Sequence, residues 1–225
     1  MSLNEILYRI LIQGGSYLTI LKGLRATVEI SVFSLIFGTL LGACICGLRM
    51  SKLKIFSIPA KIYIIILRGS PVLMLLMLMY YGIFARSSLE ANTIAIITFS
   101  LNVAAHVAEL LRASINATEK GQIEAARTLG FSAWQAFRLI TLPQIIKISK
   151  PVYQSTVINL IQWTSVVGYV SITDLTRVIN NIASRTMQPM ITIIIGMLIY
   201  LALAYIVHGI FAFTDYIQHR KEALS

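Results

Sequence analysis

Charged residues, cysteines and nucleotide-binding motifs are scarce or missing in this sequence. Only 12% of the 225 residues are charged, whereas a water-soluble domain usually contains about 25%. The two cysteines, Cys44 and Cys46, lie in one apolar run, so the sequence predicts neither a disulfide framework nor a metal site. No G-x-x-x-x-G-K-[ST] pattern occurs, which excludes a P-loop for ATP. G-x-S-x-G and H-E-x-x-H are also missing, which disfavours intramembrane hydrolysis, and we predict that the chain is not an enzyme.

Apolar and basic residues are abundant instead. Hydrophobic residues make up 57% of the chain and the mean hydropathy is +0.79, which is typical of a membrane protein. Nineteen Lys and Arg stand against nine Asp and Glu. This excess would suggest nucleic acid as the partner of a soluble chain, but in a membrane protein it marks cytoplasmic loops. The segment 1–12 lacks a cleavage site, so we expect it to be retained.

Five segments are apolar enough to cross a membrane, which predicts an all-α membrane protein with a single transmembrane domain over residues 1–225. A helix needs about 20 residues to cross a hydrocarbon core of about 30 Å. Pro71 lacks an amide donor and disfavours helix at Ser70, so we expect a break there, with an interfacial helix at 55–67 before it. The predicted spans are 26–48, 69–85, 91–111, 151–172 and 189–213.

The distribution of basic residues predicts the orientation of these spans, because cytoplasmic loops are rich in Lys and Arg. With the N-terminus outside and the C-terminus in the cytoplasm, thirteen of the nineteen basic residues fall on the cytoplasmic side. Before the first span, residues 3–11 place Ile6, Leu7 and Ile10 on one helical face. This pattern predicts a helix along the outer surface, although a frayed terminus is an equal alternative.

The cytoplasmic loop 112–150 contains two predicted short helices. The first covers 119–128 and is followed by Gly130, which suits a left-handed C-cap. Ser132 and Gln135 have the spacing of a capping box that opens the second helix, and Pro143 is expected to close it. The result is a compact knob, residues 119–142, that could contact another protein. An ordinary amphipathic loop is the alternative, and a DNA-binding helix-turn-helix is disfavoured because membrane spans flank the loop on both sides.

These residues carry a resemblance to a known family. Glu124-Ala125-Ala126, three residues, Gly130, nine residues, Ile140, one residue and Leu142-Pro143 resemble the EAA motif of bacterial ABC importer permeases. Other segments resemble the polar amino acid permeases, the histidine/glutamine permease family, and the likeness covers residues 15–212. These segments are Arg68-Gly69-Ser70-Pro71, Leu101-Asn102, Ala108-Glu109, Lys120-Gly121-Gln122, Leu142-Pro143-Gln144 and Thr164-Ser165.

The resemblance implies a type I ABC importer permease fold in the bacterial cytoplasmic (inner) membrane. It implies a coupling helix that docks on a dimer of ATPase subunits, which bind ATP and Mg, whereas this chain binds no cofactor. The implied partners are a second permease subunit, identical or paralogous, an extracytoplasmic solute-binding protein, a polar amino acid and membrane lipid, and no nucleic acid. The implied coupling residues are Glu124, Ala125, Ala126, Arg127, Gly130, Leu142 and Pro143.

Polar residues inside two predicted spans suggest where a substrate binds. An amino acid carries a carboxylate and an ammonium, so its site needs hydrogen-bond donors and acceptors together. The alternative is that these side chains join neighbouring helices, and Glu109 in particular could pair with Arg112. The sequence also differs from the family here, with Gln162-Trp163 where Lys-Asp is frequent. The predicted substrate-binding residues are Asn102, His106, Glu109, Gln162, Trp163, Thr164 and Ser165.

The outer connection 171–187 has the pattern of an amphipathic helix. Ser171-x-x-Asp174 resembles a capping box, and the apolar stripe that follows includes Leu175 and Ile179. The resemblance implies a gating or docking helix that faces the solute-binding protein, and packing over the spans is a compatible interpretation.

For the whole chain, the alternatives to amino acid import are import of another small solute and a membrane scaffold that recruits an ATPase.

Overall fold

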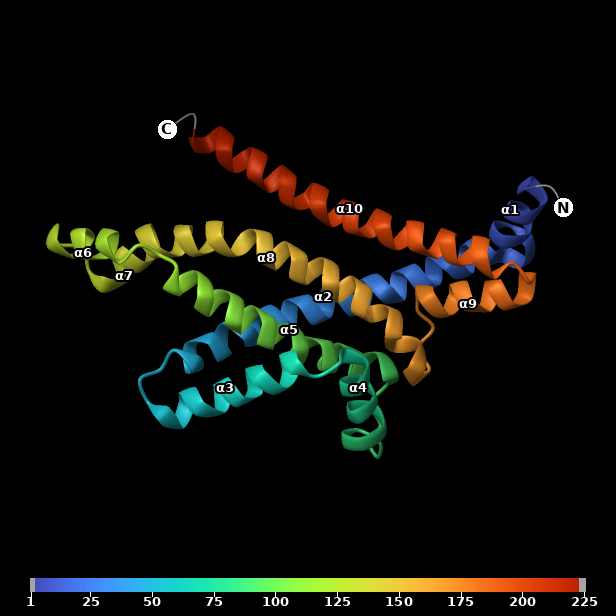
Figure 1. Cartoon of the computed structure of the whole chain (residues 1–225), viewed down its shortest axis with the longest axis horizontal. Coiled ribbons are helices and arrows are strands. Elements are labelled where there is room, and N and C mark those ends of the chain that lie inside the picture. Colours follow the sequence, from blue (N-terminus) through green and yellow to red (C-terminus); the bar gives the residue numbers. More distant parts are fainter. Residues whose placement is uncertain (1–2, 223–225) are drawn as a thin grey trace. The chain divides into compact units, whose positions relative to one another are not determined.

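The computed structural model describes residues 3–222, and every regular element in that range is a helix (Figure 1). In chain order the elements are α1 (Leu3–Leu11), η1 (Gln13–Gly15), α2 (Ser16–Arg49), α3 (Lys54–Gly69), α4 (Val72–Met77), η2 (Leu78–Ile83), α5 (Ala91–Asn116), α6 (Lys120–Thr128), α7 (Ala133–Ala136), η3 (Phe137–Thr141), α8 (Leu142–Trp163), η4 (Thr164–Val170), α9 (Leu175–Thr186) and α10 (Pro189–Glu222). Here η1 and η4 are 3₁₀-helices, whereas η2 and η3 are π-helices.

The helices form two compact units, each described separately below. The first unit contains 1–35, 71–99 and 157–225, and the second contains 36–70 and 100–156. The boundary passes through α2, α5 and α8. The single transmembrane domain expected over the whole chain stays a prediction.

Three of the described helical segments are long and apolar enough to span a membrane: Gln13–Arg49, Ala91–Asn116 and Pro189–Ile217. They confirm the first, third and fifth predicted spans as apolar helices. A fourth results only if α3 and the segment Val72–Ile83, which contains α4 and η2, count as one broken span. The predicted break at Ser70 is confirmed, because this residue has an extended backbone (φ −89°, ψ 136°). The count of five spans is not confirmed, because α8, whose apolar residues alternate with Pro, Gln, Ser, Asn and two Lys residues, is not among these segments.

The predicted end of the second knob helix at Pro143 is wrong. Pro143 is the second residue of α8, and α7, η3 and α8 follow one another without a break. A proline inside a continuous helix removes one backbone donor, and here the π-helix η3 ends just before it, where the Leu142 amide donates to the carbonyl of Phe137. The predicted span 151–172 stays a prediction: Pro151 lies inside α8, and the α-helix gives way to the 3₁₀-helix η4 after Trp163.

In the first unit, α9 packs its apolar face on α1, α2 and α10. The buried cluster contains Ile10, Ile20, Leu175, Val178, Ile179 and Ile182. Ile10 of α1 is fully buried there, so α1 is a packed helix rather than a frayed end. The capping prediction for α9 was partly wrong: Asp174, not Ser171, is the N-cap, and its carboxylate accepts the amide hydrogens of Thr176 and Arg177 at 3.0 Å each.

In the second unit, α2 and α5 approach closely at Gly38 and Gly42. A Cβ placed on either glycine would lie 2.7 Å from the Cβ of Val103 or Val107, respectively. Only glycine therefore allows these two backbones to pack at this distance.

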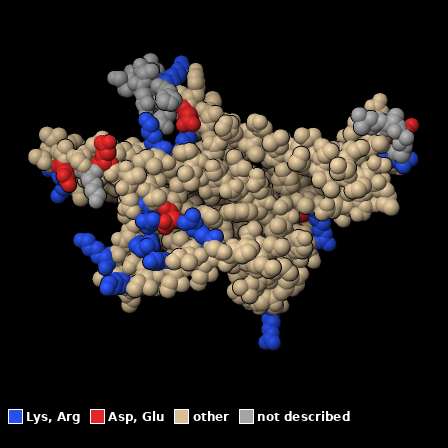
Figure 2. Space-filling model, viewed as in Figure 1, with Lys and Arg blue, Asp and Glu red and all other residues tan. Residues whose placement is uncertain are grey.

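Figure 2 shows that Lys and Arg gather over α3 and its connection to α2, while wide areas of the same face carry no charge.

Candidate coupling and substrate sites

The turn that follows α6 has the geometry the sequence predicts. Gly130 has φ +89°, the left-handed conformation that glycine adopts without steric cost. The amide of Phe131 donates to the carbonyl of Ala126 at 3.1 Å, and the amide of Gly130 donates to that of Arg127 at 3.2 Å. This pair of bonds is a Schellman motif, which satisfies the last carbonyls of the helix.

The knob is held together by further polar contacts. The predicted capping box is present. The backbone amide of Gln135 donates to the Ser132 hydroxyl at 3.2 Å, and the backbone amide of Ser132 donates to the side-chain oxygen of Gln135 at 2.8 Å. Arg127 donates to the carbonyl of Phe131 at 3.0 Å across the turn. Gln144 of α8 donates to the side-chain oxygen of Gln122 at 2.7 Å. These bonds fix α6 against α7 and the start of α8.

The knob exposes both charged and apolar side chains. Glu124, Ala125, Arg127, Gly130 and Leu142 are exposed, and so is Pro143 directly after the knob. Ala126 is only 3% exposed, so it packs inside the knob instead of facing outward. Leu129 and Trp134, which the sequence analysis did not select, are 79% and 66% exposed. Large apolar side chains at this exposure, next to charged ones, are typical of an interaction surface. The sequence could have indicated Leu129 and Trp134, because both lie next to the predicted glycine turn in a loop between two spans.

The predicted substrate residues fall in both units. Asn102, His106 and Glu109 belong to the second unit, whereas Gln162, Trp163, Thr164 and Ser165 belong to the first. Each group therefore has its own surroundings.

Asn102 is a buried residue with a structural partner. Its side-chain amide donates to the carbonyl of Leu67 at 2.8 Å. In an uninterrupted helix that carbonyl would accept the amide of residue 71, but residue 71 is Pro71 and has no N–H. Asn102 thus supplies the donor that the helix lacks at the break. The other side-chain atom, Oδ1, is buried and has no hydrogen-bond partner.

Glu109 forms an ion pair with Arg112 on the same helix. The two side chains share two hydrogen bonds, one of 2.9 Å from Nε of Arg112. This contact confirms the predicted pairing of Glu109 with Arg112, while the substrate role of Glu109 stays a prediction. His106 lies one turn before Glu109 and is half-buried.

The second group of predicted substrate residues surrounds the end of α8. Gln162 is exposed, Trp163 and Ser165 are half-buried, and Thr164 is buried and donates its hydroxyl to the carbonyl of Ile161 at 2.6 Å. Here the α-helix tightens into η4, which directs Ser165 into a cavity of about 340 Å³. The cavity is lined by Ser165, Gly168, Tyr169, Thr176, Arg177 and Asn180. Arg177 and Asn180 were not among the predicted substrate residues.

Asp174 lies next to this cavity but not in its lining. Its side chain is completely buried. Burial raises the pKa of the Asp174 carboxyl, and the backbone hydrogen bonds from Arg177 and Thr176 act in the opposite direction. The side chain of Asp174 therefore acts as the N-cap of α9.

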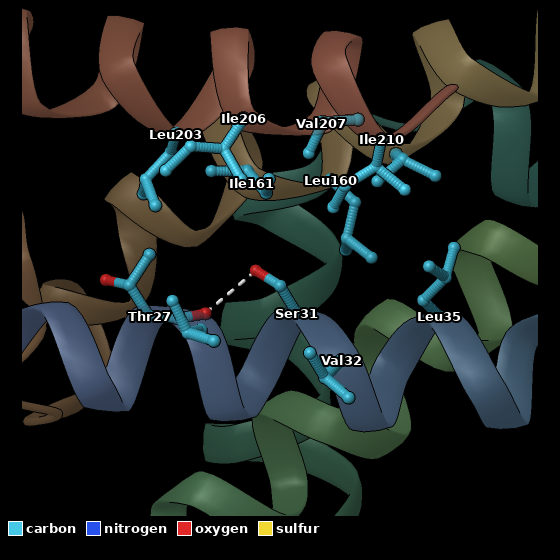
Figure 3. Close-up of a pocket in the computed structure, with 12 residues that line it drawn as sticks. Thr27, Ser31, Val32, Leu35, Leu160, Ile161, Leu203, Ile206, Val207 and Ile210 are labelled. Atoms are coloured by element: carbon cyan, nitrogen blue, oxygen red, sulfur yellow. Dashed lines mark hydrogen bonds between the residues drawn. The ribbon is translucent and has the colours of Figure 1, made fainter. Parts of the chain in front are cut away.

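A second cavity of the first unit, about 280 Å³, lies among α2, α8 and α10 (Figure 3). Its lining is aliphatic except for Thr27 and Ser31. Ser31 donates to the carbonyl of Thr27 at 2.8 Å, and the Thr27 hydroxyl accepts the amide of Leu175 at 3.3 Å. Because both hydroxyls are engaged, this cavity offers poor recognition for a polar substrate.

Comparison with known proteins identifies the family. Residues 34–220 match the family described as "Binding-protein-dependent transport system inner membrane component". The chain belongs to this family. It is a transport component of a membrane transporter, and its apolar helices agree with a location in the inner membrane.

Several named proteins resemble the chain over most of its length. The probable amino-acid ABC transporter permease protein YckA of Bacillus subtilis is 39% identical over 192 residues, which are 85% of each chain. The octopine transport system permease protein OccM of Rhizobium meliloti is 30% identical and covers 89% of this chain and 86% of its own. A solved structure described as an amino acid ABC transporter with histidines superposes with a TM-score of 0.80 at 30% identity, covering 88% of this chain and 93% of its own. The chain thus has the fold of an ABC importer permease.

Proposed function

We propose that this chain is the transmembrane subunit of an ATP-driven ABC importer that carries a polar amino acid across the bacterial cytoplasmic membrane. The observation that carries the proposal is the exposed knob with the EAA spacing, within a chain whose relatives are named as amino-acid and octopine permeases. The chain contains no P-loop, so the nucleotide chemistry belongs to a partner.

The knob is the proposed contact with that ATPase partner. A nucleotide-driven change in the partner can shift the permease between two conformations only if the two conformations contact it differently. Glu124, Arg127 and Leu129 are exposed there and would supply polar and apolar contacts. The Schellman turn and the capping box make the knob stiff, so a force applied to α6 reaches α8 instead of bending the loop.

The other proposed partners follow from the family. The ATPase dimer binds ATP and Mg, and this chain requires no cofactor of its own. A second permease subunit, identical or paralogous, completes the pathway, and an extracytoplasmic solute-binding protein delivers the amino acid. We place the N-terminus outside and the C-terminus in the cytoplasm, so that the basic loops and the knob lie on the side of the ATPase.

The proposed substrate residues differ in how free their polar groups are. The Glu109 carboxylate and the Asn102 amide group already have partners within the second unit. Ser165 instead lines an open cavity together with donors from α9. We therefore place a substrate-recognising role at the end of α8, with His106, Gln162, Trp163 and Thr164 as further candidates.

The test is reconstitution of the chain with its candidate ATPase, permease and solute-binding protein partners. We expect uptake of at least one labelled polar amino acid into liposomes that depends on both ATP and the binding protein. Recruitment of the ATPase without uptake of any amino acid would instead indicate a scaffold, and uptake of another solute alone would refute the proposed substrate class.

A further inference from the structure

The cavity between η4 and α9 has a strongly asymmetric set of polar groups. Of its six lining residues, Arg177 is the charged one, and no lining residue is acidic. Ser165 and Asn180 add a hydroxyl and a side-chain amide. Since α9 begins at Leu175 and η4 ends at Val170, the cavity faces the first turns of one helix and the last turns of the other.

The Arg177 guanidinium has spare hydrogen-bonding capacity. It is half-buried, and it makes one long contact, 3.4 Å from Nη1 to the carbonyl of Gly168. Among the side chains that the structure describes, no carboxylate lies at ion-pair distance from it. A guanidinium has five N–H donors in a planar fork, so most of its donors remain available to a ligand.

Asp174, three residues before Arg177, forms no ion pair with the guanidinium. Asp174 accepts the backbone amides of Thr176 and Arg177, and it is completely buried under the start of α9. Its carboxylate is therefore directed at the helix end rather than at the guanidinium. Thr176 is similarly engaged, because its hydroxyl pairs with that of Tyr200 at 2.9 Å.

A planar fork of donors with a positive charge matches a carboxylate, which can accept two parallel hydrogen bonds. A volume of about 340 Å³ lies in the range of small-molecule sites. We propose that Arg177, Asn180 and Ser165 form a subsite that binds the α-carboxylate of the transported amino acid. The inference rests on the proposed function and refines it, because it assigns one end of the substrate to named side chains.

The same chemistry could come from an acidic side chain of the docked solute-binding protein, so the experiment must separate the two sources. The assembled permease–ATPase complex is placed in nanodiscs without the binding protein. Binding of each of the twenty proteinogenic L-amino acids is measured, followed by the α-amide of the one that binds most tightly. The amide keeps the side chain and the ammonium but removes the carboxylate charge.

We expect the parent complex to prefer the amino acid over its α-amide by about tenfold or more, as for a charge-assisted bidentate contact. Arg177→Gln should reduce this preference to about onefold, and Arg177→Lys should give an intermediate value because it keeps the charge but loses the fork. Arg185→Gln is the matched control: it removes a positive charge from the same helix at a residue outside the cavity lining, so it should keep the parental preference. If Arg177→Gln does not assemble, Asn180→Ala, a substitution at an exposed residue, is tested instead and should lower the preference for the amino acid over its α-amide.

Three results would overturn the inference, and they are distinguishable. If Arg177→Gln keeps the parental preference but needs more binding protein for half-maximal ATPase stimulation, the carboxylate belongs to the docked protein. If it changes neither quantity, Arg177 binds no carboxylate, while the proposed function stands. If no amino acid binds the parent complex or drives uptake, the proposed function fails and this subsite with it.

Discussion

The hydrogen bond from Asn102 to Leu67 gives a quantitative prediction about the helix break. Asn102→Ala removes the donor and leaves the Leu67 carbonyl without a partner, because Pro71 cannot donate. Leu67 is half-buried, and an unsatisfied carbonyl costs about 1–3 kcal/mol where it is buried. The substitution also removes Oδ1 of Asn102, which is buried without a partner, and this relief acts in the opposite direction. A single variant therefore does not isolate the hydrogen bond.

A double-mutant cycle with Pro71→Ala isolates it. Alanine at 71 restores an N–H and lifts the restriction on helix at Ser70, so the Leu67 carbonyl gains a backbone donor. The relief from losing Oδ1 is the same in both backgrounds and cancels. We expect a coupling free energy of about 1–3 kcal/mol. In detergent this corresponds to a fall in Tm for Asn102→Ala that is about 5 °C larger in the parent than in the Pro71→Ala background.

Tyr63→Phe is the control for this cycle. Tyr63 donates its hydroxyl to the carbonyl of Leu101 at 2.7 Å. That carbonyl lies inside the continuous helix α5 and keeps its backbone donor at Ala105. Tyr63→Phe should therefore show no coupling to Pro71→Ala. Equal losses of Tm for Asn102→Ala in both backgrounds would refute the assignment of Asn102 as the donor at the break.

Two further predictions concern glycines. Gly130→Val places a β-branched residue at φ +89°, which costs about 1–2 kcal/mol or more, so it should abolish substrate-stimulated ATPase activity in vesicles while the chain still inserts. Asparagine tolerates this conformation, so the control Gly130→Asn should keep most of the stimulation. Normal stimulation in the Val variant would contradict the role of the turn. Gly38→Val should prevent assembly, seen as loss of the monodisperse peak in detergent, because its Cβ would lie 2.7 Å from Val103, whereas Gly47→Ala on the same helix meets nothing within 4 Å and should assemble normally.

Local signals in the sequence predicted several elements correctly. The periodicity of 3–11, the helix formers of 119–128, Gly130 and the Ser132/Gln135 pair all depend on residues within one or two turns of each other. Their structures agree with the predictions because capping and turn chemistry act over that range. Pro71 similarly marked the break, since its effect on Ser70 is covalent and local.

Features that depend on packing or on competing local choices were not predictable. Pro143 looked like a helix end, but α7, η3 and α8 continue through it, with the π-helix η3 ending just before the proline. Asp174 rather than Ser171 caps α9, since Ser171 adopts the left-handed conformation. The partner of Asn102 and the cavity at Arg177 bring together segments distant in sequence, which a single sequence does not reveal.

The account depends most on the claim that the knob contacts the ATPase subunit. A photo-crosslinking amino acid placed at Leu129, which is 79% exposed, tests this claim in the assembled complex. The same probe at Met187, which is 81% exposed in the turn between α9 and α10, is the control. We predict that the probe at 129 forms a covalent adduct with the ATPase and that the probe at 187 does not. An ATPase adduct from 187, with none from 129, would contradict the account.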